Sequence, residues 1–176
     1  MLVTMSRAMF DSLDNVALAW ACIRPTIEQI RGKTIIVKSR VYAQLTVGQR
    51  ALLAFWILYG HAQHGVAQFY GEVSYLLAEV DLWQFLRAGM RHIGDATMLR
   101  VIEEMEKVYL DITAAHRLEC PQWSCSVTER LVAEPEVRAK VVRFDAVFLE
   151  ILPATLTRVC AHIRDHPDEF VRFEGC

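Results

Sequence analysis

Residues 45–70 read LTVGQRALLAFWILYGHAQHGVAQFY, and the apolar run from Ala51 to Tyr59 within them decides the fold. A helix built on such a run has no hydrated face, so it has to be surrounded by other helices. The run is nine residues long, whereas a membrane span needs roughly 20 apolar residues. We therefore predict a central core helix over about residues 47–60.

The start of this helix carries its own signal. Thr46 and Gln49 fit a capping box, in which the threonine side chain accepts a hydrogen bond from the backbone three residues on and the glutamine reaches back. The sequence therefore predicts that the helix begins directly after Thr46.

Helical periodicity dominates the rest of the chain. In residues 11–31, one apolar stripe is predicted to face the core, and it consists of Leu13, Val16, Ala17, Trp20, Ile23 and Ile27. Pro25 is expected to kink this helix or to start a new one.

Further helices and connectors complete the predicted fold. The helices are expected at 73–79, 81–92, 95–112 and about 135–165, the last interrupted near Pro153. Residues 34–38 are expected to be a connector and residues 113–127 an irregular connecting loop. No segment calls for a sheet. We therefore expect residues 1–176 to form a single-domain, all-α multi-helix bundle.

Composition and charge exclude several classes of function. The net charge of −2 gives no basic face for nucleic acid. The first residues lack the pattern of a signal peptide, and the five cysteines are odd in number and irregularly spaced, which favours reduced thiols. We expect a cytoplasmic protein that binds neither nucleic acid nor a membrane.

His61 and His64 are the most suggestive polar residues in the opening stretch. Three residues apart, they are able to face one way on a helix. The zinc-protease pattern needs two histidines four apart with a glutamate between them, which is absent. A metal site would need a third ligand from His92 or from a remote acid. The alternative is that both histidines, with Gln63, satisfy backbone groups where one helix ends.

The other candidate binding residues also have two interpretations. Gln68, Phe69 and Tyr70 either line a ligand pocket with aromatic walls, or serve as core rings with a hydrogen-bonded amide. Trp123, in the CPQWSC stretch, either anchors a partner or pins its loop to the core. His162 and His166 are typical of a helix C-terminus, where the helix dipole favours them.

Motifs of the commonest enzyme classes are absent. The sequence holds no G-x-S-x-G elbow, no P-loop and no G-x-G-x-x-G. We predict no catalytic residue and no cofactor.

The motif at 45–70 resembles a family of small bacterial all-helical domains typified by a DNA-mimic protein. That family has a leucine-threonine start, a glutamine-arginine pair, an apolar helix and a Glu-Val-Asn-Asn-Gly-Gly-Phe-x-Gln-Phe-Phe motif. The matching residues here are Leu45, Thr46, Gln49, Arg50, Gly65, Gln68 and Phe69, with Tyr70 for the last aromatic. HIRDHPDEFVRF at 162–173 is similar to the family's closing segment, so the resemblance covers about residues 40–110 and 143–173.

The sequence departs from the family motif at its polar positions. Gly60 replaces the glutamate, Ala62 and Gln63 replace the asparagines, and His64 replaces the first glycine. The resemblance implies an all-helical fold, no known catalytic activity, frequent dimerisation and action by binding another protein. DNA mimicry itself is disfavoured, because a mimic needs about one charge per 1.7 Å of duplex axis and the net charge is only −2.

These observations lead to one leading functional hypothesis and one alternative. The leading hypothesis is a non-catalytic protein-interaction domain of the inhibitor or immunity type that binds another protein, and a purely structural homodimer subunit is a further interpretation. The alternative is a metal-dependent or small-ligand-binding enzyme that uses the His61/His64 region.

Overall fold

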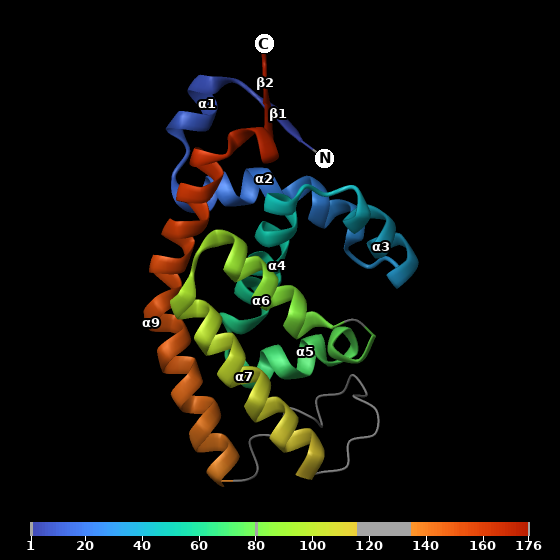
Figure 1. Ribbon diagram of the computed structural model, residues 1–176, viewed down its shortest axis with the longest axis vertical. Helices are drawn as coiled ribbons and strands as arrows, with labels where there is room; N and C mark the ends of the chain where they lie inside the picture. Colours follow the sequence, from blue (N-terminus) through green and yellow to red (C-terminus); the bar gives the residue numbers. More distant parts are fainter. Residues whose placement is uncertain (1, 80, 116–134, 176) are drawn as a thin grey trace.

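The computed structural model describes residues 2–79, 81–115 and 135–175, and it confirms the all-α class (Figure 1). The helices are α1 (Arg7–Ser12), α2 (Asn15–Ile30), α3 (Ile35–Ala43), α4 (Val47–Ala62), α5 (Val66–Glu79), α6 (Leu82–Ile93), α7 (Ala96–Ala115) and α9 (Pro135–Asp165). A short 3₁₀ helix, η1 (Pro167–Glu169), and two strands, β1 (Val3–Met5) and β2 (Val171–Phe173), complete the described elements.

Helix α4 is the centre of the bundle, as predicted. Both hydrogen bonds of the capping box form: Gln49 N–H donates to Thr46 Oγ1 and Thr46 N–H donates to Gln49 Oε1, each at 3.1 Å. The helix packs against α2, α5, α6 and α9. Its side chains from Ala51 to Phe55 are all buried, and so is Leu58. This helix therefore lies at the centre of the core, and other helices pack around it.

The enclosure of α4 is nevertheless incomplete. Trp56, Ile57 and Tyr59 are only half-buried, although the apolar run predicted a helix covered on all sides. The helix also continues past Gly60 to Ala62. One side of its C-terminal half therefore meets solvent.

Neither internal proline breaks its helix. Helix α2 continues through Pro25 and α9 continues through Pro153, so no new helix begins at Pro25 and the interruption predicted near Pro153 is wrong. Buried residues lie on both sides of each proline, for example Cys22 and Thr26 in α2. Packing of these flanking residues outweighs the loss of one backbone hydrogen bond.

Two predicted loops are partly helical. Residues 34–38, expected to be a connector, lie at the start of α3, which begins after Thr34. Helix α7 continues to Ala115, so residues 113–115 of the predicted loop at 113–127 are helical. The β-branched residues after Thr34 suggested extended chain, but their intrinsic preference against helix is small. Residues 116–127 lie outside the described part of the chain.

The two ends of the described chain pair as a short parallel sheet, which the sequence did not predict. Val3 pairs with Val171 and Met5 with Phe173, and the strands lie together beyond the end of α9 (Figure 1). Strands of three residues carry too few side chains to show an alternating pattern. The pairing fixes the chain that follows α9.

Helix α9 runs along one side of the molecule (Figure 1). Among the described residues it is the one helix long and apolar enough to cross a membrane by length and composition, and 28% of that apolar window is buried. Its inner face carries Phe144, Phe148 and Ile163 into the core. Its outer face leaves Val142 and Leu149 exposed.

Helices α4 and α6 approach each other closely in the core. A Cβ atom added to Gly89 of α6 would lie 2.7 Å from Ala54 Cβ and 3.3 Å from the Ala51 carbonyl oxygen. Real Cβ atoms do not approach at 2.7 Å, so the small residues on both helices allow the approach of α6 to α4.

We predict opposite effects for two glycine-to-alanine changes. Gly89→Ala should lower the free energy of unfolding by about 1–3 kcal/mol, because the new methyl group has no room between the helices. Gly60→Ala should raise it by about 0.5–1 kcal/mol, because Gly60 is helical, has nothing within 4 Å of its added Cβ, and gains helix propensity. Urea denaturation measures both values, and a stabilising Gly89→Ala would contradict the close contact.

Candidate functional site: an aromatic groove beside the helix junction

The stretch at 60–70 is the junction between α4 and α5. Helix α4 ends at Ala62, and the backbone N–H of Gln63 donates to the Tyr59 carbonyl at 3.3 Å. Gly65 then adopts φ +117°, a conformation that other residues rarely take. The free N–H of Val66 at the start of α5 donates to Asp145 Oδ1 of α9 at 2.6 Å. The turn is therefore fixed both by its glycine and by a carboxylate from α9.

Glu72 of α5 organises the polar side chains of this junction. His61 Nδ1 lies 2.5 Å from Glu72 Oε2, and Gln68 Nε2 donates to Glu72 Oε1 at 2.5 Å. Burial raises the pKa of Glu72, but the hydrogen bonds from His61 and Gln68, together with the charges of His61 and His64, outweigh it and lower this pKa below 4.5. Sequence reasoning missed Glu72, because it lies outside the quoted motif.

Among the described residues, His61 and His64 do not belong to a group of three potential metal ligands. His61 is engaged by Glu72, and His64 is exposed. Within residues 2–79, 81–115 and 135–175, three potential ligands converge elsewhere, at His92, His162 and Glu169. The His61 pairing therefore connects α4 to α5, which agrees with the interpretation of this stretch as a helix end.

Phe69 and Tyr70 point into the core. Both side chains are fully buried, and the Tyr70 hydroxyl donates to the Met105 carbonyl of α7 at 2.7 Å. Burial raises the pKa of Tyr70 above its usual range, and the charges of Asp145 and Tyr109 add to the effect. The rings therefore hold α5 against α7 and do not line an open pocket. Trp123 lies outside the described residues.

A shallow aromatic groove opens next to the junction, between the first half of α2 and the second half of α4. Trp20 stacks on Trp56 with ring centroids 5.2 Å apart, and Trp56 lies 5.4 Å from Tyr59. The groove has a volume of about 550 Å³. Its lining residues are Asp14, Val16, Ala17, Trp20, Trp56, Tyr59 and Gln63. Of the predicted site residues, Gln63 lines this groove.

Apolar side chains at the groove are exposed to water, which is unfavourable for the folded chain. Trp20 is 39% exposed and Val16 is 49% exposed, although the predicted stripe placed both in the core. Ile23 of the predicted stripe is buried, and α2 also buries Leu18 and Cys22, which lie outside that stripe. Exposed tryptophan and tyrosine side by side are typical of protein-binding surfaces, where they supply most of the binding energy.

Charge at the groove is of one sign. Asp14 is the single charged residue among the described residues that line it, and the carboxylate also caps α2, since the Ala17 N–H donates to Asp14 Oδ1 at 2.8 Å. The cap fixes the position of this negative charge at the rim. The groove therefore combines aromatic faces with one anchored carboxylate.

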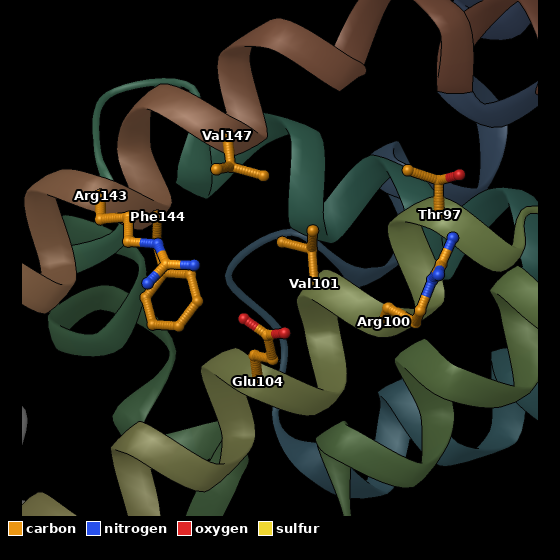
Figure 2. Close-up of a pocket in the computed structure, with 7 residues that line it drawn as sticks. All are labelled: Thr97, Arg100, Val101, Glu104, Arg143, Phe144 and Val147. Carbon is orange, nitrogen blue, oxygen red and sulfur yellow. The ribbon is translucent and has the colours of Figure 1, made fainter.

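A second hollow, between α7 and α9, lacks this convergence (Figure 2). It has a volume of about 260 Å³ and is lined by two arginines and one glutamate among apolar residues. Figure 2 shows Arg100 extending towards Thr97, whereas Arg143 lies beside Phe144. The two guanidinium groups do not point at a common centre, so they form no anion site.

The histidines near the end of α9 form a group of their own. The His162 ring lies 4.8 Å from the ring of His92 at the end of α6 and 4.7 Å from that of His166. Burial lowers the pKa of His162, and the charges of His92 and His166 lower it further, against Glu169 and Asp165. His162 therefore stays neutral at neutral pH.

The two described cysteines are poor nucleophiles. Burial raises the pKa of Cys22 to about 12, and the charge of Cys160 adds to this effect. Burial also raises the pKa of Cys160 to about 11, against the opposing charge of Arg164. Both thiols are free and remain protonated at neutral pH, a state without nucleophilic reactivity.

Comparison of the chain with protein-family models, with curated proteins and with solved structures gives no match. The resemblance to the DNA-mimic type of family therefore stays a proposal.

We predict that Glu72 contributes to the acid sensitivity of the fold. Its pKa is lower in the folded chain than its ordinary value of 4.5, so its stabilising effect is complete above that pH and disappears as the pH falls through the folded pKa. Glu72→Gln should therefore lower stability at pH 7 and leave it unchanged near pH 2. Urea denaturation between pH 2 and pH 7 measures this difference.

The exposed carboxylate of Glu104 supplies the control. Glu104→Gln should follow the wild-type pH profile more closely than Glu72→Gln does. Parallel profiles for wild type and Glu72→Gln over the whole range would show that the Glu72 contacts contribute nothing to stability.

Proposed function

We propose that this protein is a non-catalytic binding domain whose groove between α2 and α4 accepts a segment of another protein. The observation that supports this proposal is the stacked pair Trp20 and Trp56 beside Tyr59, in which Trp20 is exposed and the other two rings are half-buried at the groove. Rigid aromatic side chains lose little conformational entropy when a partner covers them. Burial of apolar area contributes about 25 cal/mol per Å².

The groove chemistry specifies the kind of segment. An apolar side chain fits against Val16 and the aromatic rings, and an adjacent lysine or arginine fits beside Asp14. Such a cation also meets the ring faces, where a cation–π contact contributes about 0.5–2 kcal/mol. The proposed ligand is therefore an amphipathic segment with an apolar anchor next to a base.

A second copy of this chain fits the groove less well. In a twofold symmetric contact each copy would present the same lining residues to the other. The contact would bring two Asp14 carboxylates into one interface, and none of the lining residues that the structure describes is a base to neutralise them. The charge therefore favours a foreign segment over self-association, and the family resemblance likewise favours binding of another protein, as an inhibitor or immunity protein would.

The enzyme alternative has weaker support. His61 is engaged by Glu72, and Phe69 and Tyr70 are in the core. Of the remaining residues of that alternative, Gln68 donates to the same carboxylate of Glu72, and Gln63 and His64 are exposed. The groove between α2 and α4 is therefore the better-supported binding site.

The test uses helical peptides displayed on phage and selected for binding to the immobilised wild-type protein. The expected consensus has a large apolar residue flanked by lysine or arginine. Trp20→Ala should weaken the selected synthetic peptides by tenfold or more, which is about 1.4 kcal/mol. Asp14→Asn should weaken them less, because asparagine keeps the helix cap and removes only the charge. Isothermal titration measures each affinity.

Leu149→Ala is the matched control, because Leu149 is exposed to a similar degree on the outer face of α9. It should leave peptide affinity unchanged. Peptides that lose affinity in Leu149→Ala and keep it in Trp20→Ala would contradict the proposed groove. A stable dimer of the wild-type protein that Trp20→Ala dissociates would identify a second copy as the occupant instead.

A further inference from the structure

Three potential metal ligands from distant parts of the chain meet where α6 and α9 end. One ligand atom each from His92, His162 and Glu169 lies within 4.8 Å of the others. His92 belongs to the last turn of α6, His162 to the last turn of α9, and Glu169 to η1. From the sequence, His92 was a candidate third ligand for His61 and His64, and the structure places it with this second group.

One buried ring nitrogen of His162 makes no hydrogen bond within the described part of the chain. His162 Nε2 is buried, and among the described residues it has no hydrogen-bond partner. A buried polar atom without a partner carries a desolvation cost that a ligand would remove. The helix-end interpretation of His162 explains its place in the last turn, but not this unpartnered atom.

Glu169 is held in place by the start of α4. Its Oε2 atom accepts a hydrogen bond from the Gly48 N–H at 2.5 Å, and its backbone carbonyl accepts one from Thr46 Oγ1 at 2.9 Å. Its other oxygen, Oε1, lies 3.9 Å from His92 Nε2. Hydrogen bonds of this kind orient a ligating carboxylate in metal proteins.

Gly48 is required for this arrangement. A Cβ at this position would lie 2.7 Å from Phe170 Cζ and 2.8 Å from Glu169 Oε2. The glycine therefore lets both the carboxylate and the Phe170 ring approach the first turn of α4. The carboxylate is fixed before any ion arrives, and its second oxygen remains available.

From this geometry we infer that His92, His162 and Glu169 form a binding site for a zinc-type divalent transition-metal ion. Two imidazoles and one carboxylate are a ligand set that zinc uses with a fourth position left to water. Around a tetrahedral zinc ion the ligand atoms are about 3.4 Å apart. The present separations of 3.9 Å to 4.8 Å require a small inward movement, which the exposed His92 side chain is able to supply.

The ligand chemistry also sets the selectivity. Magnesium and calcium prefer sites made of oxygen atoms, so two nitrogen ligands disfavour both ions. The ion would connect α6, α9 and η1 beside the start of α4, whereas the His61–Glu72 pair lies at the end of that helix. This role is independent of the peptide groove.

The test begins with the full chain freed of metal by a chelator and titrated with Zn²⁺, with Co²⁺ as a spectroscopic substitute. We expect one ion per chain, a higher midpoint of thermal unfolding with Zn²⁺, and no shift with Mg²⁺. The visible absorption of bound Co²⁺ should indicate four or five ligands of nitrogen and oxygen. A thiolate-to-cobalt band in the near ultraviolet would instead place the ion on cysteines and overturn the inference.

Two variants test the ligands without disturbing the core. His92→Ala changes an exposed residue, and Glu169→Gln retains an oxygen that accepts from Gly48. Each should weaken Zn²⁺ by about tenfold or more, while circular dichroism and the thermal midpoint of the metal-free protein stay close to wild type. The double variant His61→Ala/His64→Ala is the control and should keep wild-type affinity. Wild-type affinity in His92→Ala or Glu169→Gln, or its loss in the control, would refute the site.

Discussion

The burial of α4 is the constraint on which the rest of the structure depends. Its apolar run offers few polar groups for water to hydrate, so α2, α5, α6 and α9 all pack against it. Gly89 brings α6 close enough to cover one side. Both candidate sites lie at the margins of this enclosure. The first turn of α4 holds Glu169 through Gly48, and its second half leaves Trp56 and Tyr59 open to the groove.

Local signals made the central helix predictable. The capping box and the apolar run act within a few residues, so α4 and the all-α class follow from sequence alone. The prolines were misleading for the same reason. A proline lowers the stability of an isolated helix, yet α2 and α9 continue through Pro25 and Pro153 because residues on both sides are buried in the core. The β1–β2 pair joins opposite ends of the chain and has no local signal at all.

The candidate sites were less predictable, because they depend on which apolar face meets solvent. The helical spacing of apolar residues in α2 predicted that Trp20 faces the core. Helix α2, however, carries apolar residues on more than one of its faces, so the spacing alone does not decide which face is buried. Leu18 and Cys22 take the buried positions, and Trp20 is left to stack on Trp56. The histidine group shows the same limit, since His92 and His162 meet only after α6 and α9 have packed. Sequence spacing contains no information about such contacts.

The end of α9 connects the two sites physically. Arg164 lies two residues after His162, and its guanidinium group donates to Asn15 Oδ1 at 3.1 Å and to the Leu13 carbonyl at 2.8 Å. These acceptors flank Asp14, which caps α2 at the rim of the groove. A planar guanidinium group fixes two acceptors at once, so the last turn of α9 positions both the His162 ring and the start of α2. The residues that would contact a peptide and a metal ion remain separate, whereas the helix end that orients them is shared.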